Sequence, residues 1–366
     1  MFDKDPRTVL TLDAGGTNLV FSAIRENTEV TPPLTLPADT QDLKNCLNTI
    51  VSGFEQVKKR IEGEPVAISF AFPGPADYEN GIIGDLPNFP CFRGGVALGP
   101  FLKMKFGLPV FINNDGHLFA YGEALAGALP QINRELKESG SRRQFKNLIA
   151  VTIGTGFGGG IVINNRLLFG DNGSAANLWS MANKRDGSQI AEAGISVRAV
   201  QKEYAQQSGT KVSLSPREIF EIAEGSRTGD QLAAINAFNE LGTMAGFTLA
   251  ETLNVADGLV VIGGGIANAH KYLLPAIIAE INGRRTLIDG EQVPCLPAQA
   301  YNLMDQEQKN EFLIDAAKKI MIPGSEKSIE YACGKKTGIV ISSLGTSRAV
   351  ALGAYAFALT KLDINN

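Results

Sequence analysis

The sequence predicts an α/β protein built from two related halves, and two observations support that prediction. The first is an internal repeat: residues 10–24 and residues 149–163 share one layout, in which a hydrophobic strand, a Gly/Thr turn and a second hydrophobic strand follow one another. The second is the alternation of hydrophobic runs with segments of helical periodicity. A chain of 366 residues is long enough for about two domains.

The elements of the first half are read from their hydrophobic patterns. Residues 8–13 and 19–24 predict two strands of a hairpin, because the glycines between them allow a tight turn. Residues 42–63 carry one apolar stripe at helical spacing. Residues 110–113 predict a strand that leads into a helix beginning near Asp115.

The second half repeats this organisation and adds a long C-terminal segment. We place the domain boundary near residue 115 and expect the C-terminus to return to the first half, because chain termini often lie close together. The predicted smaller domain is 1–114 plus 346–366, and the predicted larger domain is 115–345. Residues 283–344 form a polar enlargement that fits either a subunit contact or a lid.

The composition bounds the partners and the compartment. Hydrophobic residues make up 44% of the chain and the net charge is −4, so no basic excess favours a nucleic-acid partner. No apolar run approaches the ~18 residues of a spanning helix, and the N-terminal residues lack a signal-peptide pattern. We therefore expect a cytoplasmic protein with no membrane partner. The four cysteines are scattered without a CxxC pair, which argues against zinc.

The glycine turns are candidate phosphate sites. Consecutive backbone N–H groups in such a turn bind anions, and Thr17 and Thr155 each add a hydroxyl donor. No P-loop motif occurs, and the GxGxxG that starts at Gly154 leads into a strand instead of a helix, which excludes a dinucleotide fold. Asp13 beside a phosphate makes chemical sense if Mg²⁺ lies between them. One hairpin alone needs no ligand, but two hairpins plus the glycines at 263–265 favour nucleotide binding.

Several motifs together resemble one family. LDAGGTN, PGP, LPN, NND, GTGFGGG and IGGG occur in the order seen in the ROK family of sugar kinases, close to bacterial glucokinases, over residues 8–270 and from 345 to the end. The resemblance implies two ribonuclease-H-like domains of the actin-like ATPase fold around a central cleft for ATP and sugar. It assigns the ATP phosphates to the two turns, through Asp13, Gly15, Gly16, Thr17, Asn18, Thr155 and Gly156. It assigns the adenosine to the third glycine cluster, through Gly264 and Gly265.

The resemblance makes Asp115 the general base. Phosphorylating a hydroxyl requires a group that accepts its proton, and a carboxylate at the end of a strand is placed to do so. The alternative is that Asp115 caps a helix, and both roles are compatible. Asn114 and Asn88 are the expected sugar-binding amides, because an amide both donates and accepts. Asn88 alternatively serves a turn.

This chain departs from the family pattern after the second hairpin. Where members carry GxAGExGH, it has GSAANLWS, so Asn177 stands at the sugar-binding Glu and Ser180 at the His that ligates zinc in many members. We therefore expect no zinc. Glu192, within IAEAGIS, resembles the sugar-binding Glu of zinc-free glucokinases, and the alternative for Glu192 is an exposed acid at a helix start.

These observations predict an ATP-dependent carbohydrate kinase. Asp13 reaches Mg²⁺, through water in our interpretation, and Asp115 takes the hydroxyl proton of a hexose or amino sugar. The alternative is a non-catalytic regulator of the same fold that binds sugar or nucleotide, and the loss of Glu and His at 177 and 180 motivates it. The family suggests a homodimer.

Overall fold

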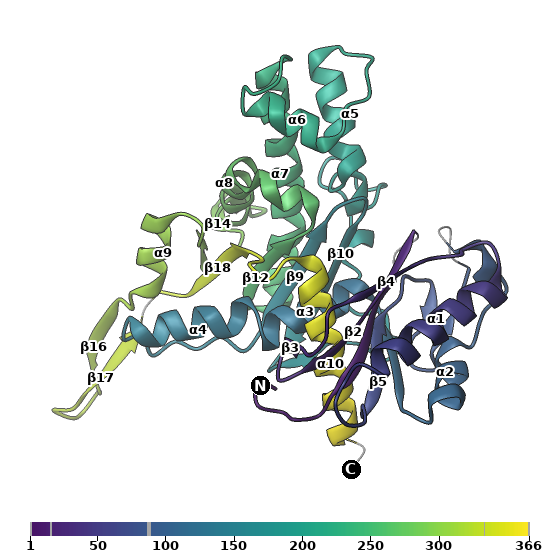
Figure 1. The fold of residues 1–366 in the computed structure, drawn as a ribbon. Coiled ribbons are helices and arrows are strands. Elements are labelled where there is room, and N and C mark those ends of the chain that lie inside the picture. The colour runs from purple at the N-terminus through teal and green to yellow at the C-terminus, as the bar shows by residue number, and fades with distance from the viewer. Residues whose placement is uncertain (1, 15–16, 86–88, 333, 365–366) are drawn as a thin grey trace. The chain divides into compact units, whose positions relative to one another are not determined.

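The computed structural model describes residues 2–14, 17–85, 89–332 and 334–364. The chain forms two compact units (Figure 1). The first unit consists of residues 1–127, 159–176 and 343–366, and the second consists of residues 128–158 and 177–342. Each unit is an α/β structure, as the sequence predicts, and the C-terminal helix belongs to the first unit.

The first unit is built on a mixed sheet with the strand order β3-β2-β1-β5-β8, and β4 pairs with β2. The β1–β2 hairpin is antiparallel, whereas β5 and β8 run parallel to their neighbours. A short β6–β7 hairpin follows β5. The strands are β1 (Val9–Ala14), β2 (Asn18–Arg25), β3 (Thr28–Glu29), β4 (Leu34–Pro37), β5 (Ala67–Ala71), β6 (Ala76–Asp77), β7 (Ile82–Ile83) and β8 (Val110–Asn113).

Helices cover both faces of this sheet. One face packs on α1 (Leu43–Lys58) and α2 (Leu98–Phe106) through a core rich in phenylalanine, in which Phe21 and Phe54 meet edge to face. The hydrophobic stripe predicted over 42–63 is this buried side of α1, which Asp42 caps by accepting the N–H of Asn45. The short turn η1 (Pro90–Phe92) lies before α2.

The other face packs on α10 (Thr346–Ile364), and α3 (Asp115–Leu125) lies against α10 (Figure 1). Glycines make this close approach possible. A Cβ on Gly122 would collide with the carbonyl oxygen of Ala349, and a Cβ on Gly353 with that of Leu118. The end of the chain thereby fixes the helix that begins at Asp115.

The second sheet has the strand order β11-β10-β9-β12-β18-β15, in which β9, β12 and β18 are parallel. It repeats the first sheet: a strand, two following strands on one side, and later parallel strands on the other. The sequence repeat therefore reflects a repeated topology. The strands are β9 (Leu148–Ile153), β10 (Phe157–Ile163), β11 (Arg166–Leu167), β12 (Leu259–Gly263), β15 (Gln299–Asn302) and β18 (Lys336–Ile341).

The helices of the second unit pack largely on one another, and α7, α8 and α9 also contact its strands. The 26-residue α7 packs mainly on α8, and it also contacts α5, α6 and β9. Glycine-containing turns precede α5 and α8. The helices are α4 (Ala128–Glu138), α5 (Val197–Ser208), α6 (Pro216–Ala223), α7 (Gln231–Ala256), α8 (His270–Ile281) and α9 (Gln306–Leu313), and the 3₁₀ turns are η2 (Leu178–Ser180), η3 (Ala191–Ala193) and η4 (Gly265–Ala269).

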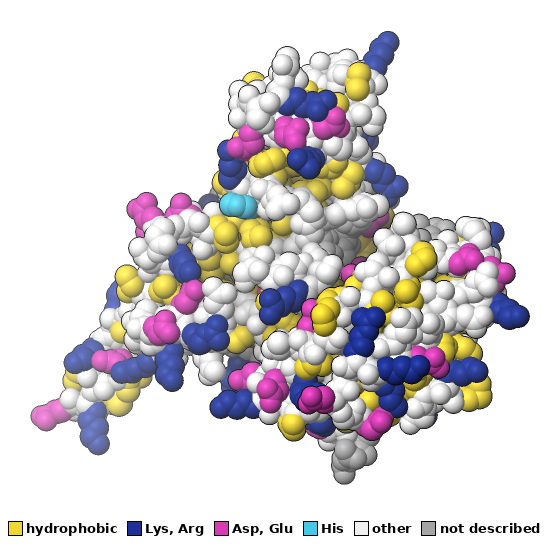
Figure 2. All heavy atoms as spheres, viewed as in Figure 1, with side chains coloured by type: hydrophobic (Ala, Val, Ile, Leu, Met, Phe, Trp, Pro, Cys, Tyr) yellow, Lys and Arg dark blue, Asp and Glu magenta, His cyan; other side chains and the backbone are white. Residues whose placement is uncertain are grey.

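The enlargement predicted over 283–344 contains two hairpins besides α9, β15 and β18. They are β13 (Arg284–Thr286) with β14 (Gln292–Pro294), and β16 (Ala317–Met321) with β17 (Ser328–Ala332). The second hairpin projects from its unit (Figure 1) and carries exposed hydrophobic and basic side chains (Figure 2). Of the helices that the structure describes, none is long and apolar enough to cross a membrane.

Candidate active site

Asp13 lies near the end of β1, next to the first glycine turn. It is in register with Val20 of β2 and with Ala71 of β5, so its strand is held on both sides. Asn18 begins β2, and the carbonyl oxygen of Thr17 accepts the N–H of Ala38. The predicted phosphate-binding residues Gly15 and Gly16 lie outside the described residues.

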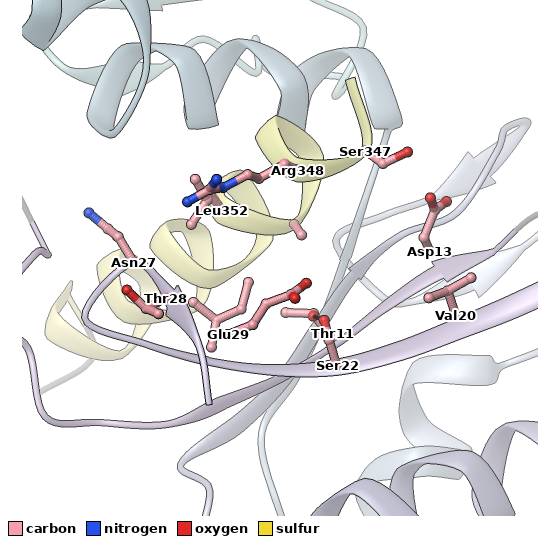
Figure 3. A pocket seen from close by; sticks show the side chains of 12 residues that line it. Thr11, Asp13, Val20, Ser22, Asn27, Thr28, Glu29, Ser347, Arg348 and Leu352 are labelled. Carbon is pink, nitrogen blue, oxygen red and sulfur yellow. Dashed lines mark hydrogen bonds between the residues drawn. The ribbon is translucent and has the colours of Figure 1, made fainter. Parts of the chain in front are cut away.

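Asp13 opens onto a cavity of about 450 Å³ within the first unit (Figure 3). The cavity lies between the start of α10 and the strands β1 and β2, and Ser347 lines it opposite Asp13. Burial raises the pKa of Asp13, the Ser347 hydroxyl lowers it by donating a hydrogen bond to the carboxylate, and the charge of Asp115 raises it. The first unit therefore brings Asp13 and Asp115 close enough for their charges to interact. A divalent cation would relieve that repulsion.

Asp115 is the first residue of α3, but it is not the cap of that helix. The N-cap is Asn114, whose Oδ1 accepts the N–H groups of Gly116 (2.8 Å) and His117 (3.4 Å). The alternative that Asp115 serves as the cap is therefore wrong. The Asp115 side chain is exposed, and its Oδ1 accepts the N–H of Gly116 at 2.9 Å. Its carboxylate remains accessible to a substrate.

Besides capping α3, the Asn114 side chain contacts a residue that the sequence did not indicate. Its side chain hydrogen bonds with Tyr78, whose hydroxyl donates to the carbonyl oxygen of Phe72 at 2.9 Å. Burial raises the pKa of Tyr78 to about 12, so this phenol stays neutral. Because Tyr78 lies in a loop without a motif, only the folded chain reveals it. The other predicted amide, Asn88, lies outside the described residues.

His117 holds the first turn of α3 in place through a buried ring. The ring is buried, Nε2–H donates to the carbonyl oxygen of Ala175 (3.1 Å), and Nδ1 lies 3.3 Å from Oδ1 of Asn113. Burial lowers the pKa of His117, which keeps the ring neutral near pH 7. This histidine therefore positions the helix start that carries Asp115.

The second glycine turn joins β9 to β10 and is held in shape by its own backbone. The N–H of Gly154 donates to the carbonyl oxygen of Gly156 (2.9 Å), and the carbonyl oxygen of Gly154 accepts the N–H of Val197 (2.9 Å). Thr155 is exposed at the tip of the turn. Such a turn presents an exposed hydroxyl and backbone donors to an anion.

Gly264 and Gly265 follow β12 and have different surroundings. Gly264 has φ 89° and ψ 166°, and a Cβ there would collide with the carbonyl oxygen of Ile153 at the end of β9. Gly265 instead faces open space, with no heavy atom within 4 Å of a Cβ built on it. Gly264 thus packs β12 onto the second turn, and Gly265 leaves room for a ligand beside it, which fits the adenosine expected there.

Glu192 lies in the 3₁₀ turn η3 and contacts the second glycine turn. Its Oε2 accepts the N–H of Phe157 at 3.0 Å, and its side chain is only 25% exposed. Glu192 does lie in the first turn of a 3₁₀ helix, but it is not the exposed acid of the alternative interpretation. Arg198 forms an ion pair with Glu192 at 3.6 Å. Arg198 was not predicted from the sequence, because it belongs to no motif and meets Glu192 only in the folded chain.

Asn177 and Ser180, the residues that replace the family Glu and His, lie in a separate turn of the second unit. Asn177 is exposed, and its Oδ1 accepts the indole N–H of Trp179 at 3.4 Å. The Ser180 hydroxyl donates to the backbone carbonyl oxygen of Asn177 at 2.9 Å. Their side chains contact this turn itself, and Trp179 is 43% exposed.

The residues present fit a nucleotide with Mg²⁺ better than a metal held by protein alone. In the part of the chain that the structure describes, no three His, Cys, Asp or Glu side chains cluster as metal ligands. Mg²⁺ is usually bound through one or two carboxylates together with substrate phosphates and water. A single carboxylate such as Asp13 beside a glycine turn meets that requirement.

Comparison with known proteins identifies the family. The family model of the ROK family matches residues 9–307. The chain belongs to the ROK family. The resemblance seen in the sequence is thereby confirmed, and so is the actin-like ATPase fold that this family implies.

Individual relatives are sugar kinases by name. The structure of a glucokinase from Parabacteroides distasonis is 50% identical, with a TM-score of 0.89 over 98% of this chain and 99% of that one. The glucokinase of Thermotoga maritima is 27% identical, covering 72% of this chain and 83% of the relative. The N-acetyl-D-glucosamine kinase of Haemophilus influenzae is 25% identical, covering 73% and 86%.

Proposed function

We propose that this protein is an ATP-dependent sugar kinase in which Asp115 is the general base. The observation that carries the proposal is the accessibility of the Asp115 carboxylate at the start of α3. Asn114 caps the helix, so the Asp115 carboxylate is exposed and available, and it lies close enough to Asp13 to affect that residue's pKa. A general base must reach the proton that it removes.

The relatives support the enzyme class. Two of the proteins named above are glucokinases and one is an N-acetyl-D-glucosamine kinase, so the prediction of an ATP-dependent carbohydrate kinase is confirmed at the level of the class. The residues described above add the chemistry. The first unit holds the carboxylates of Asp13 and Asp115. The second unit, taken by itself, holds the Gly154–Phe157 turn with the exposed Thr155.

Each residue has one role in the proposed reaction. Mg²⁺·ATP, when bound, supplies the phosphoryl group and the positive charge that balances it. Asp13 would orient the metal, through water in our interpretation, and Ser347 holds the Asp13 carboxylate. Asp115 accepts the proton of the sugar hydroxyl as that oxygen forms its bond to the γ-phosphorus of ATP. The bond from this phosphorus to the bridging oxygen breaks, and ADP leaves with the electron pair. Thr155, Gly156 and Gly265 contact the nucleotide.

The sugar specificity is set by residues that differ from the family pattern. Asn177 offers a neutral amide where members use a carboxylate, so the hydroxyl that members bind there would lose a charge-assisted hydrogen bond. Glucose and N-acetylglucosamine are the first candidates, because relatives named for kinases of both sugars match this chain. The homodimer stays a prediction.

A panel of acceptors tests the proposal. Purified protein with Mg²⁺ and ATP is assayed for ADP release against hexoses, N-acetylhexosamines and hexosamines, with a reaction lacking sugar as the blank. We expect turnover above the blank with at least one hexose or N-acetylhexosamine. Absence of turnover across the panel, while ATP and a sugar still raise the melting temperature, would favour the non-catalytic regulator.

A further inference from the structure

A carboxylate lies directly against the second glycine turn. Oε2 of Glu192 accepts the N–H of Phe157 at 3.0 Å, and a Cβ built on Gly156 would lie 2.6 Å from the same oxygen. A negative charge at this distance opposes the binding of phosphates to the turn. A positive charge close to Glu192 would offset this repulsion.

Arg198 is the residue that can supply this charge. Its Nη2 lies 3.6 Å from Oε1 of Glu192, the oxygen that Phe157 does not use. Among the described residues, no other Lys or Arg forms an ion pair with Glu192. The Arg198 side chain is 77% exposed, and the 3.6 Å ion pair is too long for a good hydrogen bond, so the guanidinium can move to a new partner.

The backbone holds Arg198 next to the turn. The preceding residue, Val197, begins α5 and donates its N–H to the carbonyl oxygen of Gly154 at 2.9 Å. The start of α5 is thus hydrogen bonded to Gly154 at the beginning of the turn, whereas Glu192 contacts Phe157 at the end of the same turn. A long side chain on this first helical turn stays within reach of whatever the turn binds.

We propose that Arg198 binds the phosphates of the nucleotide at the second glycine turn. The inference rests on the proposed function, because it assumes that the turn contacts ATP. The guanidinium forms charge-assisted hydrogen bonds with a phosphate oxygen while its other side remains beside Glu192. Glu192 then acts as a positioning residue, which holds Phe157 through Oε2 and directs Arg198 through Oε1.

The test compares nucleotides that differ in phosphate number. ATP, ADP and adenosine are titrated calorimetrically into the full-length protein and into Arg198→Gln, without sugar. We expect ATP and ADP to bind about 10- to 100-fold more weakly to the variant, the range for a lost hydrogen bond to a charged group, with adenosine affinity unchanged. Arg198→Lys should recover part of the ATP affinity, because it keeps the charge.

Arg217→Gln is the matched control. Arg217 is an exposed arginine of the same unit that pairs with Glu221 at 3.0 Å within α6, so its loss should leave all three affinities unchanged. Arg198 is excluded as a phosphate ligand if Arg198→Gln binds ATP as wild type does, or if ATP and adenosine affinities fall equally. A wild-type protein that binds ATP through Arg198 but phosphorylates no sugar would overturn the proposed function and leave this inference standing.

Discussion

The acidic residues beside the two glycine turns of this protein are positioned by different parts of the chain. In the first unit, Asp13 is part of the strand that enters the turn, and its partner Ser347 comes from the C-terminal helix. In the second unit, Glu192 comes from a 3₁₀ turn far along the chain and reaches the turn through the N–H of Phe157. The two sheets thus share a topology, but the carboxylates beside their glycine turns have different surroundings. The surroundings of Asp13 suit a metal ion, and those of Glu192 suit an arginine.

The largest effect on stability that we expect concerns the backbone supporting the second turn. Gly264→Ala should lower the free energy of unfolding by about 2–5 kcal/mol, because φ 89° and ψ 166° suit only glycine and a Cβ would strike the carbonyl oxygen of Ile153. Denaturant unfolding measures it. Gly265→Ala is the control, since nothing lies within 4 Å of its Cβ position, and equal destabilisation by both would contradict the packing role of Gly264.

The next effect concerns the acid of the first turn. Asp13→Asn should reduce turnover about 10- to 100-fold, the usual cost of losing a residue that orients a metal through its ligands. It should also raise the melting temperature at pH 7. Activity and thermal unfolding, measured on the same preparation, test both parts.

The sign of the stability change follows from the pKa. Burial raises the pKa of Asp13 above its unfolded value, so this carboxyl stabilises the fold below about pH 4 and loses that contribution as the pH rises through the folded pKa. At pH 7 its charge opposes folding, and asparagine removes the charge. The rise in melting temperature should be small, because Asp13 is exposed and solvent screens its charge. A melting temperature that falls at pH 7 would show that the Asp13 carboxylate serves the fold.

The smallest effect concerns Ser347, the partner of Asp13. Its hydrogen bond lowers the pKa of Asp13, so Ser347→Ala should move the acid limb of the kcat/KM profile to higher pH. At pH 7, kcat/KM should fall by less than about tenfold, the effect of one hydrogen bond. An unchanged acid limb would mean that Asp13 does not control that limb. Ser139→Ala is the control: Ser139 follows α4, its hydroxyl donates to the carbonyl oxygen of Leu136, and its loss should leave the acid limb unchanged.

The sequence predicted what is local and missed what depends on distant contacts. The β1–β2 hairpin, the strand before Asp115 and the helix at its carboxyl end follow from periodicity and turn chemistry, and the structure has them where expected. Asn114 and Asp115 are neighbours, so residue type alone did not say which of them caps α3. Tyr78, Ser347 and Arg198 carry no motif, because each meets its partner only through the fold.

The direct test of the central claim is the kcat of Asp115→Asn with the acceptor that the panel identifies. If Asp115 takes the hydroxyl proton, kcat should fall about 10²- to 10⁴-fold. The melting temperature and the dissociation constants for ATP and sugar should stay close to wild type, because Asn114 still caps the helix. A variant that keeps its kcat while binding both substrates would contradict the assignment of Asp115 as the base.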